Sequence, residues 1–144
     1  MNTASLIESV KNQFPDAVSG SHTYRGDATL VLRPESLLEV ARFLKQDPAF
    51  QMNFLVDLTA VDYLTFGKRP TPAFFASSGV ALRPSSQIPD EDPWPGPPAR
   101  ARFALVYHFY SMTHKHRLRL VVPLEETDAA ADSMTSLWPG ANWL

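Results

Sequence analysis

The sequence predicts an α+β fold of two layers, in which helices pack on one face of a mostly antiparallel β-sheet. Apolar residues alternate with a period of two over residues 101–110 and again over 117–123, which is typical of a hairpin of half-buried strands. Two other stretches, 3–14 and 34–46, repeat apolar residues at helical spacing. A length of 144 residues suits one domain. We therefore expect a single domain over 1–144, with a proline-rich insertion loop at about 65–100.

The composition excludes several classes of function. The chain has no cysteine, so it forms no disulfide, no thiolate metal site, no iron–sulfur ligation and no cysteine nucleophile. A formal net charge of -2 gives no general reason to expect nucleic acid or an anionic membrane as a partner. No apolar run approaches the roughly 18 residues of a membrane span, and Glu8 precedes any signal-like core. We expect a cytoplasmic protein that does not span the membrane.

The N-terminal quarter of the sequence predicts a helix followed by a short hairpin. Thr3 or Ser5 can cap the helix, and Pro15 ends it. Its apolar stripe consists of Leu6, Ile7, Val10 and Phe14. Two strand candidates follow at 17–24 and 28–32, joined by a turn in which Gly26 can adopt a positive φ.

A second helix and a third strand are predicted next. Pro34 suits the first turn of a helix that ends before Pro48. The apolar stripe of this helix is Leu37, Leu38, Ala41, Phe43 and Leu44. The second half of 54–64 is expected to be a strand. Its two acids, Asp57 and Asp62, are five residues apart and would point to opposite faces, so strand-end or capping roles are favoured over a catalytic acid–base pair.

Residues 65–100 form the predicted insertion, because eight prolines fall there without stable periodicity. Such a stretch can adopt polyproline II structure and bind an aromatic groove of a partner, but a tolerated surface insertion is favoured. The sequence gives no explanation for the apolar pair Phe74 and Phe75 within it.

The hairpin itself separates apolar and polar residues onto two faces. One face is expected to carry Phe103, Leu105, Tyr107, Phe109, Leu118, Leu120 and Val122, and the other Val106, His108, Arg117 and Arg119. We expect Tyr107 to lie opposite Leu118 and Leu105 opposite Leu120, with a four-residue loop from Ser111 to His114.

Three chemical interpretations of this polar face compete. His108, His114 and His116 could bind a metal, but His108 is expected on the opposite face from the other two. Arg117, Arg119 and Lys115 with Tyr107 and Tyr110 resemble a small nucleic-acid platform, which the acidic sequence disfavours. A solvated or partner-binding strand face is favoured over both. No glycine-rich phosphate loop or nucleophile elbow occurs, so no catalytic, cofactor-binding or metal residue is assigned.

The C-terminal segment predicts one or two helical turns within 124–131, followed by an apolar tail. Trp138 and Trp143 carry large apolar surfaces that favour burial with their indole N–H groups paired. We therefore expect either that the tail docks on another surface or that the sequence has been cut short.

Several stretches of the sequence resemble the C subunit of NADH:quinone oxidoreductase, respiratory complex I. They are Leu55-Val56-Asp57-Leu58-Thr59-Ala60-Val61-Asp62-Tyr63, Tyr107-His108-Phe109-Tyr110-Ser111, His116-Arg117-Leu118-Arg119-Leu120, Val122-Pro123-Leu124 and Ser136-Leu137-Trp138-Pro139-Gly140-Ala141-Asn142-Trp143-Leu144. The family's pattern continues past the position of Leu144 into a charged helix that begins Glu-Arg-Glu, which this sequence lacks. The loop at 65–100 is an apparent insertion into that pattern.

The resemblance implies a structural subunit that holds no cofactor and lies in the peripheral arm of the complex, on the cytoplasmic face of the membrane. Its expected partners are the subunits that form the quinone pocket and hold the terminal iron–sulfur cluster. The expected interface residues are Trp138, Asn142, Trp143, Arg117 and Arg119. The alternative is an independent protein-interaction module that uses the proline-rich loop or the His and Arg face of the hairpin.

Overall fold

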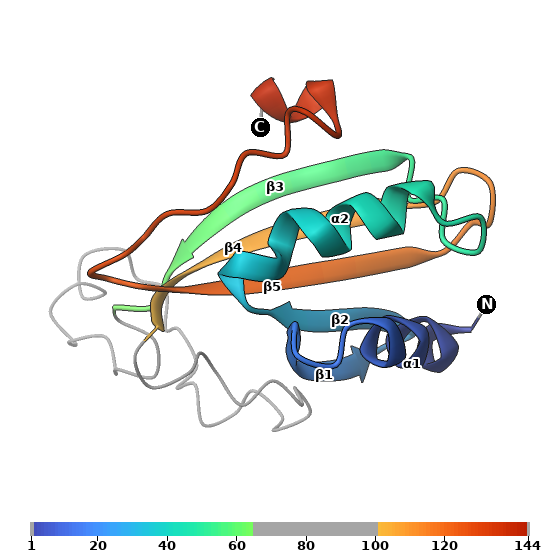
Figure 1. The fold of residues 1–144 in the computed structure, drawn as a ribbon, viewed down its shortest axis with the longest axis horizontal. Helices are drawn as coiled ribbons and strands as arrows, with labels where there is room; N and C mark the ends of the chain where they lie inside the picture. Colours follow the sequence, from blue (N-terminus) through green and yellow to red (C-terminus); the bar gives the residue numbers. More distant parts are fainter. Residues whose placement is uncertain (1, 65–100, 144) are drawn as a thin grey trace, which may run out of the picture.

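The computed structural model describes residues 2–64 and 101–143, which form a five-stranded sheet with two α-helices (Figure 1). The strands are β1 (Val18–Tyr24), β2 (Asp27–Leu32), β3 (Phe54–Asp62), β4 (Ala101–Tyr110) and β5 (Arg117–Glu125). The helices are α1 (Thr3–Gln13) and α2 (Leu37–Gln46), with short 3-10 helices η1 (Pro34–Ser36) and η4 (Pro139–Trp143). The α+β prediction is confirmed. The proline-rich stretch, with Phe74 and Phe75, lies outside the described residues.

The strand order is β1-β2-β5-β4-β3, so the last strand in the sequence lies in the middle of the sheet. Three neighbouring pairs are antiparallel, and β2 runs parallel to β5. The sheet is therefore mostly antiparallel, as expected. Neither helix in the described part of the protein has the length and apolar character needed to cross a membrane.

Helix α1 is capped by Asn2, which precedes both predicted caps, Thr3 and Ser5. The side chain of Asn2 accepts a hydrogen bond from the backbone N–H of Ser5 at 2.8 Å, which satisfies one of the free donors of the first turn. Thr3 instead uses its hydroxyl to donate to the carbonyl oxygen of Gly26 at 2.6 Å. Gly26, with φ 89°, and Arg25, with φ 49°, form the tight turn between β1 and β2, as the sequence predicted for the glycine.

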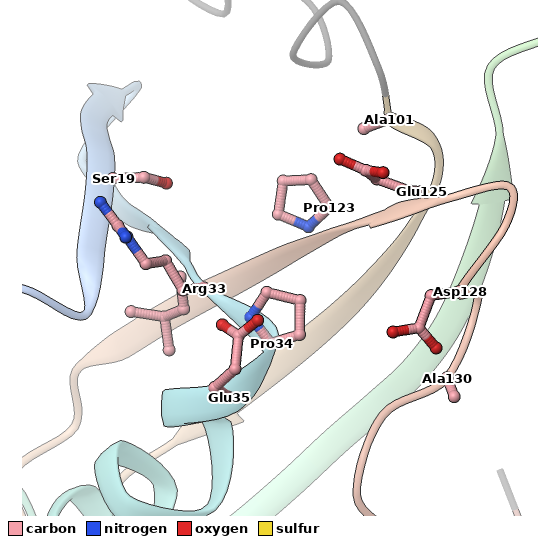
Figure 2. A pocket seen from close by; sticks show the side chains of 10 residues that line it. Ser19, Arg33, Pro34, Glu35, Ala101, Pro123, Glu125, Asp128 and Ala130 are labelled. Carbon is pink, nitrogen blue, oxygen red and sulfur yellow. The ribbon is translucent and has the colours of Figure 1, made fainter.

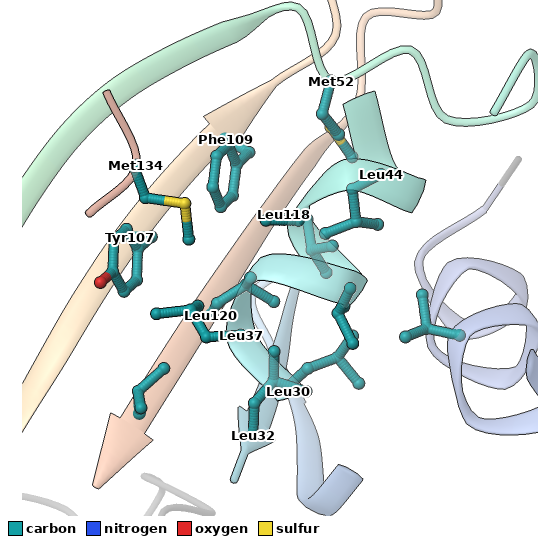
Figure 3. Packing of buried hydrophobic residues seen from close by; sticks show 14 of the residues in the cluster. Leu30, Leu32, Leu37, Leu44, Met52, Tyr107, Phe109, Leu118, Leu120 and Met134 are labelled. Carbon is teal, nitrogen blue, oxygen red and sulfur yellow. The ribbon is translucent and has the colours of Figure 1, made fainter. Parts of the chain in front are cut away.

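Both helices contribute to one core on one face of the sheet (Figure 3). The sheet residues of this core share a face because they are cross-strand partners: Leu30 pairs with Leu120, which pairs with Tyr107. The helices add buried residues, which are Leu6, Ile7 and Val10 from α1 and Leu37, Val40, Ala41 and Leu44 from α2. Val40 belongs to the stripe of α2 although the sequence prediction left it out.

Strand β3 occupies the whole of 54–62 rather than its second half alone. Phe54 pairs with Tyr110 at the first end, and the ladder is interrupted by a bulge between Leu55 and Asp57. The bulge inserts Val56 as an extra residue, which disturbs the alternation that a sequence pattern relies on.

The hairpin of β4 and β5 has the predicted faces but a different register. Tyr107 pairs with Leu120 and Phe109 with Leu118, a shift of two residues from the prediction. A shift of two leaves every side chain on the same face. The cause is a longer loop over residues 111–116, which is closed by a 3.0 Å hydrogen bond from the Ser111 N–H to the His116 carbonyl.

The predicted helical turns at 124–131 are wrong. Strand β5 continues to Glu125, because Leu124 is the next core-facing residue of the alternating pattern and is buried. Residues 126–133 form a turn and a non-helical stretch that is exposed to solvent. The backbone then returns to the core through Met134, Leu137, Trp138 and Ala141.

Candidate functional site

The face of the sheet opposite the helices carries the arginines that the sequence predicted for an interface. Arg119 lies between the core residues Leu118 and Leu120 along β5, so its side chain points away from the helix layer. Two adjoining hollows on this open face share His108 and Arg119, and we call them together the open-face groove. The groove also includes Asp27, Thr29, Phe54, Val56, Asp57, Tyr110, Met112 and Arg117.

A row of polar residues crosses all five strands in this groove. Cross-strand pairing aligns Asp57 of β3 with His108 of β4, His108 with Arg119 of β5, Arg119 with Thr29 of β2, and Thr29 with His22 of β1. Partners in a ladder lie on the same face, so the five side chains form one continuous line. The predicted polar face is therefore wider than the hairpin.

Arg119 is the cation of this row, and Asp57 is its anion. Burial lowers the pKa of His108, and the nearby positive charge of Arg119 lowers it further, while Asp57 and Asp27 oppose this shift. A lowered pKa keeps the imidazole of His108 neutral at pH 7. The permanent positive charges of the groove are then those of Arg119 and Arg117.

These two arginines differ from Arg102, which lies at the other end of β4. Arg102 binds the carboxylates of Asp62, at 3.0 Å, and Glu126. Within the described part of the sequence, neither Arg117 nor Arg119 forms an ion pair, and the buried Nε of Arg119 has no hydrogen-bond partner. The charge of Arg102 is therefore paired within this protein, whereas the half-buried charge of Arg119 forms no ion pair among the described residues.

One end of the groove exposes large apolar side chains that the sequence analysis did not single out. Phe54, Val56 and Met112 leave 50%, 49% and 53% of their surfaces exposed. Phe54 and Val56 lie around the bulge of β3, and Met112 lies in the hairpin loop. Strand β3 is at the edge of the sheet, a position that is set by long-range pairing and that its own apolar residues do not reveal.

The predicted interface residues of the tail lie in two different environments. Trp138 is buried, packs against Phe109 with ring centroids 4.8 Å apart, and donates its indole N–H to the Met52 carbonyl at 3.1 Å. Trp143 leaves 91% of its surface exposed, and Asn142 is exposed beside it. Trp138 thus anchors the tail inside this protein, and only Asn142 and Trp143 are reachable from outside.

The histidines considered as metal ligands do not converge. His114 and His116 stack with ring centroids 5.5 Å apart, and their Nε2 atoms donate to the carbonyls of Pro48 and Phe50 at 2.8 and 3.0 Å. These bonds fix the hairpin loop to the segment before β3. His108 lies on the open face, and no group of three His, Cys, Asp or Glu in 2–64 and 101–143 could hold a metal ion.

The acids of β3 are also separated, as predicted. Asp57 pairs with His108 and Asp62 with Phe103, five residues away along β4, so the two carboxylates lie on opposite faces. The hydrogen bonds from Arg102 lower the pKa of Asp62. A paired general acid and base is therefore excluded at this position.

A further hollow lies where β5 ends and η1 begins (Figure 2). It gathers Glu35, Glu125 and Asp128 together with Arg33. All four side chains belong to residues that are exposed to solvent. The hollow carries no feature that points to a ligand, and the open-face groove remains the candidate site.

Comparison with known proteins places the sequence among respiratory proteins. Residues 30–144 match the model of the family described as respiratory-chain NADH dehydrogenase, 30 Kd subunit. The C subunit of NADH-quinone oxidoreductase from Roseiflexus sp. (strain RS-1) is 34% identical over 143 residues, which cover 99% of this chain and 63% of the relative. The corresponding subunit of Coxiella burnetii (strain RSA 493 / Nine Mile phase I) is also 34% identical, covering 96% of this chain and 60% of the relative.

A solved structure has the same fold. A trypsin-resistant fragment of Nqo5 superimposes with a TM-score of 0.64 and 24% sequence identity, covering 100% of this chain and 86% of the fragment. The chain spans about 60–63% of the length of the two curated relatives above.

Proposed function

The chain belongs to the family of the respiratory-chain NADH dehydrogenase 30 Kd subunit, and on that basis we propose that it is a non-catalytic structural subunit of proton-translocating NADH:quinone oxidoreductase. It would lie in the peripheral arm, on the cytoplasmic face of the membrane, and support electron transfer from NADH to quinone. Family membership over residues 30–144 is the observation that carries this proposal.

The chemistry of the side chains supports a structural role. A sequence without cysteine cannot supply the thiolate ligands of an iron–sulfur cluster. The acids of β3 point to opposite faces, and the stacked histidines are engaged with backbone carbonyls. Among the described residues, the open-face groove and the exposed tail residues Asn142 and Trp143 are the groups that we propose for contact with a partner.

We infer that the partners are the subunits of the peripheral arm that form the quinone pocket and hold the terminal iron–sulfur cluster. Aromatic and arginine side chains are enriched at the energetic centres of interfaces, which supports contacts through Trp143, Arg117 and Arg119. Trp138 would act indirectly, because its burial fixes the path of the tail that presents Trp143.

The test is purification of the full-length gene product from its own organism, with an affinity tag added to the chromosomal gene. Under the proposal, the tagged protein is recovered from detergent-solubilised membranes with an NADH-oxidising iron–sulfur complex. Recovery as a free protein without iron–sulfur partners would contradict the proposal and favour an independent interaction module.

A second measurement tests whether side chains of this protein take part in the reaction. Substitutions in the open-face groove, such as Asp57→Asn or His108→Gln, should change the amount of assembled complex and leave NADH:quinone turnover per assembled complex unchanged. A fully assembled complex with strongly reduced turnover would show that these side chains take part in the reaction.

A further inference from the structure

We propose that the open-face groove docks a segment of a neighbouring protein chain that carries a carboxylate side chain flanked by apolar residues. Arg119, assisted by Arg117, would bind the carboxylate, and Phe54, Val56 and Met112 would contact the apolar residues. This inference rests on the proposed function, since the neighbouring protein would be another subunit of the same complex.

Arg119 is the centre of the argument. Its backbone is fixed in the middle strand of the sheet, and its Nε is buried without a hydrogen-bond partner among the described residues. The Asp57 carboxylate belongs to a strand two positions away, which separates the two backbones by roughly 10 Å. Asp27 belongs to the adjacent strand β2, two residues before Thr29, the cross-strand partner of Arg119. Neither acid forms an ion pair with Arg119. A half-buried cation without a carboxylate partner is unfavourable, and a carboxylate from outside would relieve that cost.

The charges in the groove favour a single acidic side chain over a polyanion as the bound group. The groove contains two arginines and also two acids, Asp27 and Asp57. A polyanion such as nucleic acid would meet these two carboxylates as repulsive charges, whereas one carboxylate can approach Arg119 alone. The groove therefore fits a single acidic side chain better than a phosphate backbone.

The apolar end of the groove indicates that the residues beside the partner's acid are apolar. Phe54, Val56 and Met112 are about half exposed and line the same hollow as Arg117 and Arg119. Exposed apolar side chains beside charged ones are typical of a protein interface with a dry centre and a polar rim. A peptide segment with an acidic residue between apolar residues complements both parts.

The experiment places a photo-cross-linker in the groove of the full-length protein within the purified complex. Met112 or Phe54 is replaced by p-benzoylphenylalanine, the complex is irradiated, and the cross-linked peptide is identified by mass spectrometry. The expected product joins this protein to one segment of another subunit that contains Asp or Glu next to apolar residues.

Charge variants then test the role of the arginines. Arg119→Gln and Arg117→Glu should each lower the cross-link yield, with loss of the Arg119 contact reducing it at least about tenfold. Exposed Arg42, on the helix layer, provides the matched control, and Arg42→Glu should leave the yield unchanged. Arg119→Glu should also lower the yield, and replacing the identified acid of the partner by Lys should restore the yield lost in Arg119→Glu.

The outcomes separate this inference from the proposed function. If the tagged protein does not purify with an iron–sulfur complex, the proposed function fails. If the complex is recovered but the cross-links lead only to a second copy, to residues 65–100 of the same molecule, or to no protein, the docking inference fails alone. Equal loss of cross-link yield in Arg42→Glu would also overturn the inference, because the loss would then result from the changed net charge of the protein and not from the groove.

Discussion

Replacement of Trp138 by alanine should strongly destabilise the fold, because this side chain holds the C-terminal tail to the sheet. Trp138 is 5% exposed, packs on Phe109 with ring centroids 4.8 Å apart, and donates its indole N–H to the Met52 carbonyl at 3.1 Å. The Lys45 ammonium lies 5.4 Å from the ring centroid and donates to the carbonyl of Leu137. One substitution therefore removes packing, a buried hydrogen bond and a cation–π contact.

The magnitude follows from these contacts. Truncation of a buried tryptophan to alanine costs about 3–5 kcal/mol of unfolding free energy. A domain of this length loses roughly 2–4 °C of Tm for each kcal/mol, so Trp138→Ala should lower the Tm by about 10 °C. Trp138→Phe keeps a ring against Phe109 but leaves the Met52 carbonyl unpaired, and should cost about 1–3 kcal/mol.

The assay is urea denaturation followed by far-UV circular dichroism, which does not depend on the tryptophans that are being replaced. Trp143→Ala is the matched control, since that side chain is 91% exposed and should change stability by about 0.5 kcal/mol or less. Equal destabilisation by both substitutions, or a neutral Trp138→Ala, would refute the role assigned to Trp138.

Three further predictions concern other parts of the protein. Gly26→Ala forces a side chain into φ 89° and should cost about 1 kcal/mol in urea denaturation, whereas Gly140→Ala, whose new methyl group meets open space, should cost less. Arg102→Leu removes the hydrogen bonds that lower the pKa of Asp62, so an NMR titration should show this pKa rising toward its ordinary value. Burial lowers the pKa of His116; the unfolded state therefore binds more protons, and stability should fall as the pH drops below about 6.5.

Each of these predictions has a clear negative outcome. Equal stability of Gly26→Ala and Gly140→Ala would mean that the turn between β1 and β2 does not require a positive φ at residue 26. An unchanged Asp62 titration in Arg102→Leu would mean that the ion pair does not persist in solution. For His116, the comparison is His116→Phe. This variant should be less stable at pH 7, because it lacks the hydrogen bond to the Phe50 carbonyl, and its stability should fall less as the pH is lowered. If the stability of both proteins falls equally in acid, groups other than His116 cause the pH dependence.

The sequence could predict which face each strand residue occupies but not the pairing along the hairpin. The period of two places Tyr107 and Leu118 on the apolar face. It does so equally in the predicted register and in the observed one, because the two registers differ by two residues. The actual register depends on the loop, where Lys115 adopts φ 58° and donates its N–H to the Ser111 carbonyl at 2.9 Å. A lysine carries no sequence signal for a left-handed conformation, so the longer loop could not be anticipated.

The candidate site was predictable only where it lies within the hairpin. Arg117 and Arg119 were identified from the alternation of β5, and the structure places both in the open-face groove. Thr29 and His22 join the same row only because β2 pairs in parallel with β5, a contact between residues about ninety positions apart that no local pattern encodes. The different environments of Trp138 and Trp143 likewise depend on the path of the tail.

The position of β5 between β2 and β4 limits the order in which the sheet can assemble. The hairpin of β1 and β2 is made of residues 18–32, whereas the strand that covers the free edge of β2 begins at Arg117. During synthesis, the edges of β2 and β4 both remain unpaired until residues 117–125 have left the ribosome. Pairing at such sequence separation is slow, and unpaired edges promote association with other molecules. Substitutions in β5 that delay its insertion should therefore increase aggregation during expression more than they lower the equilibrium stability.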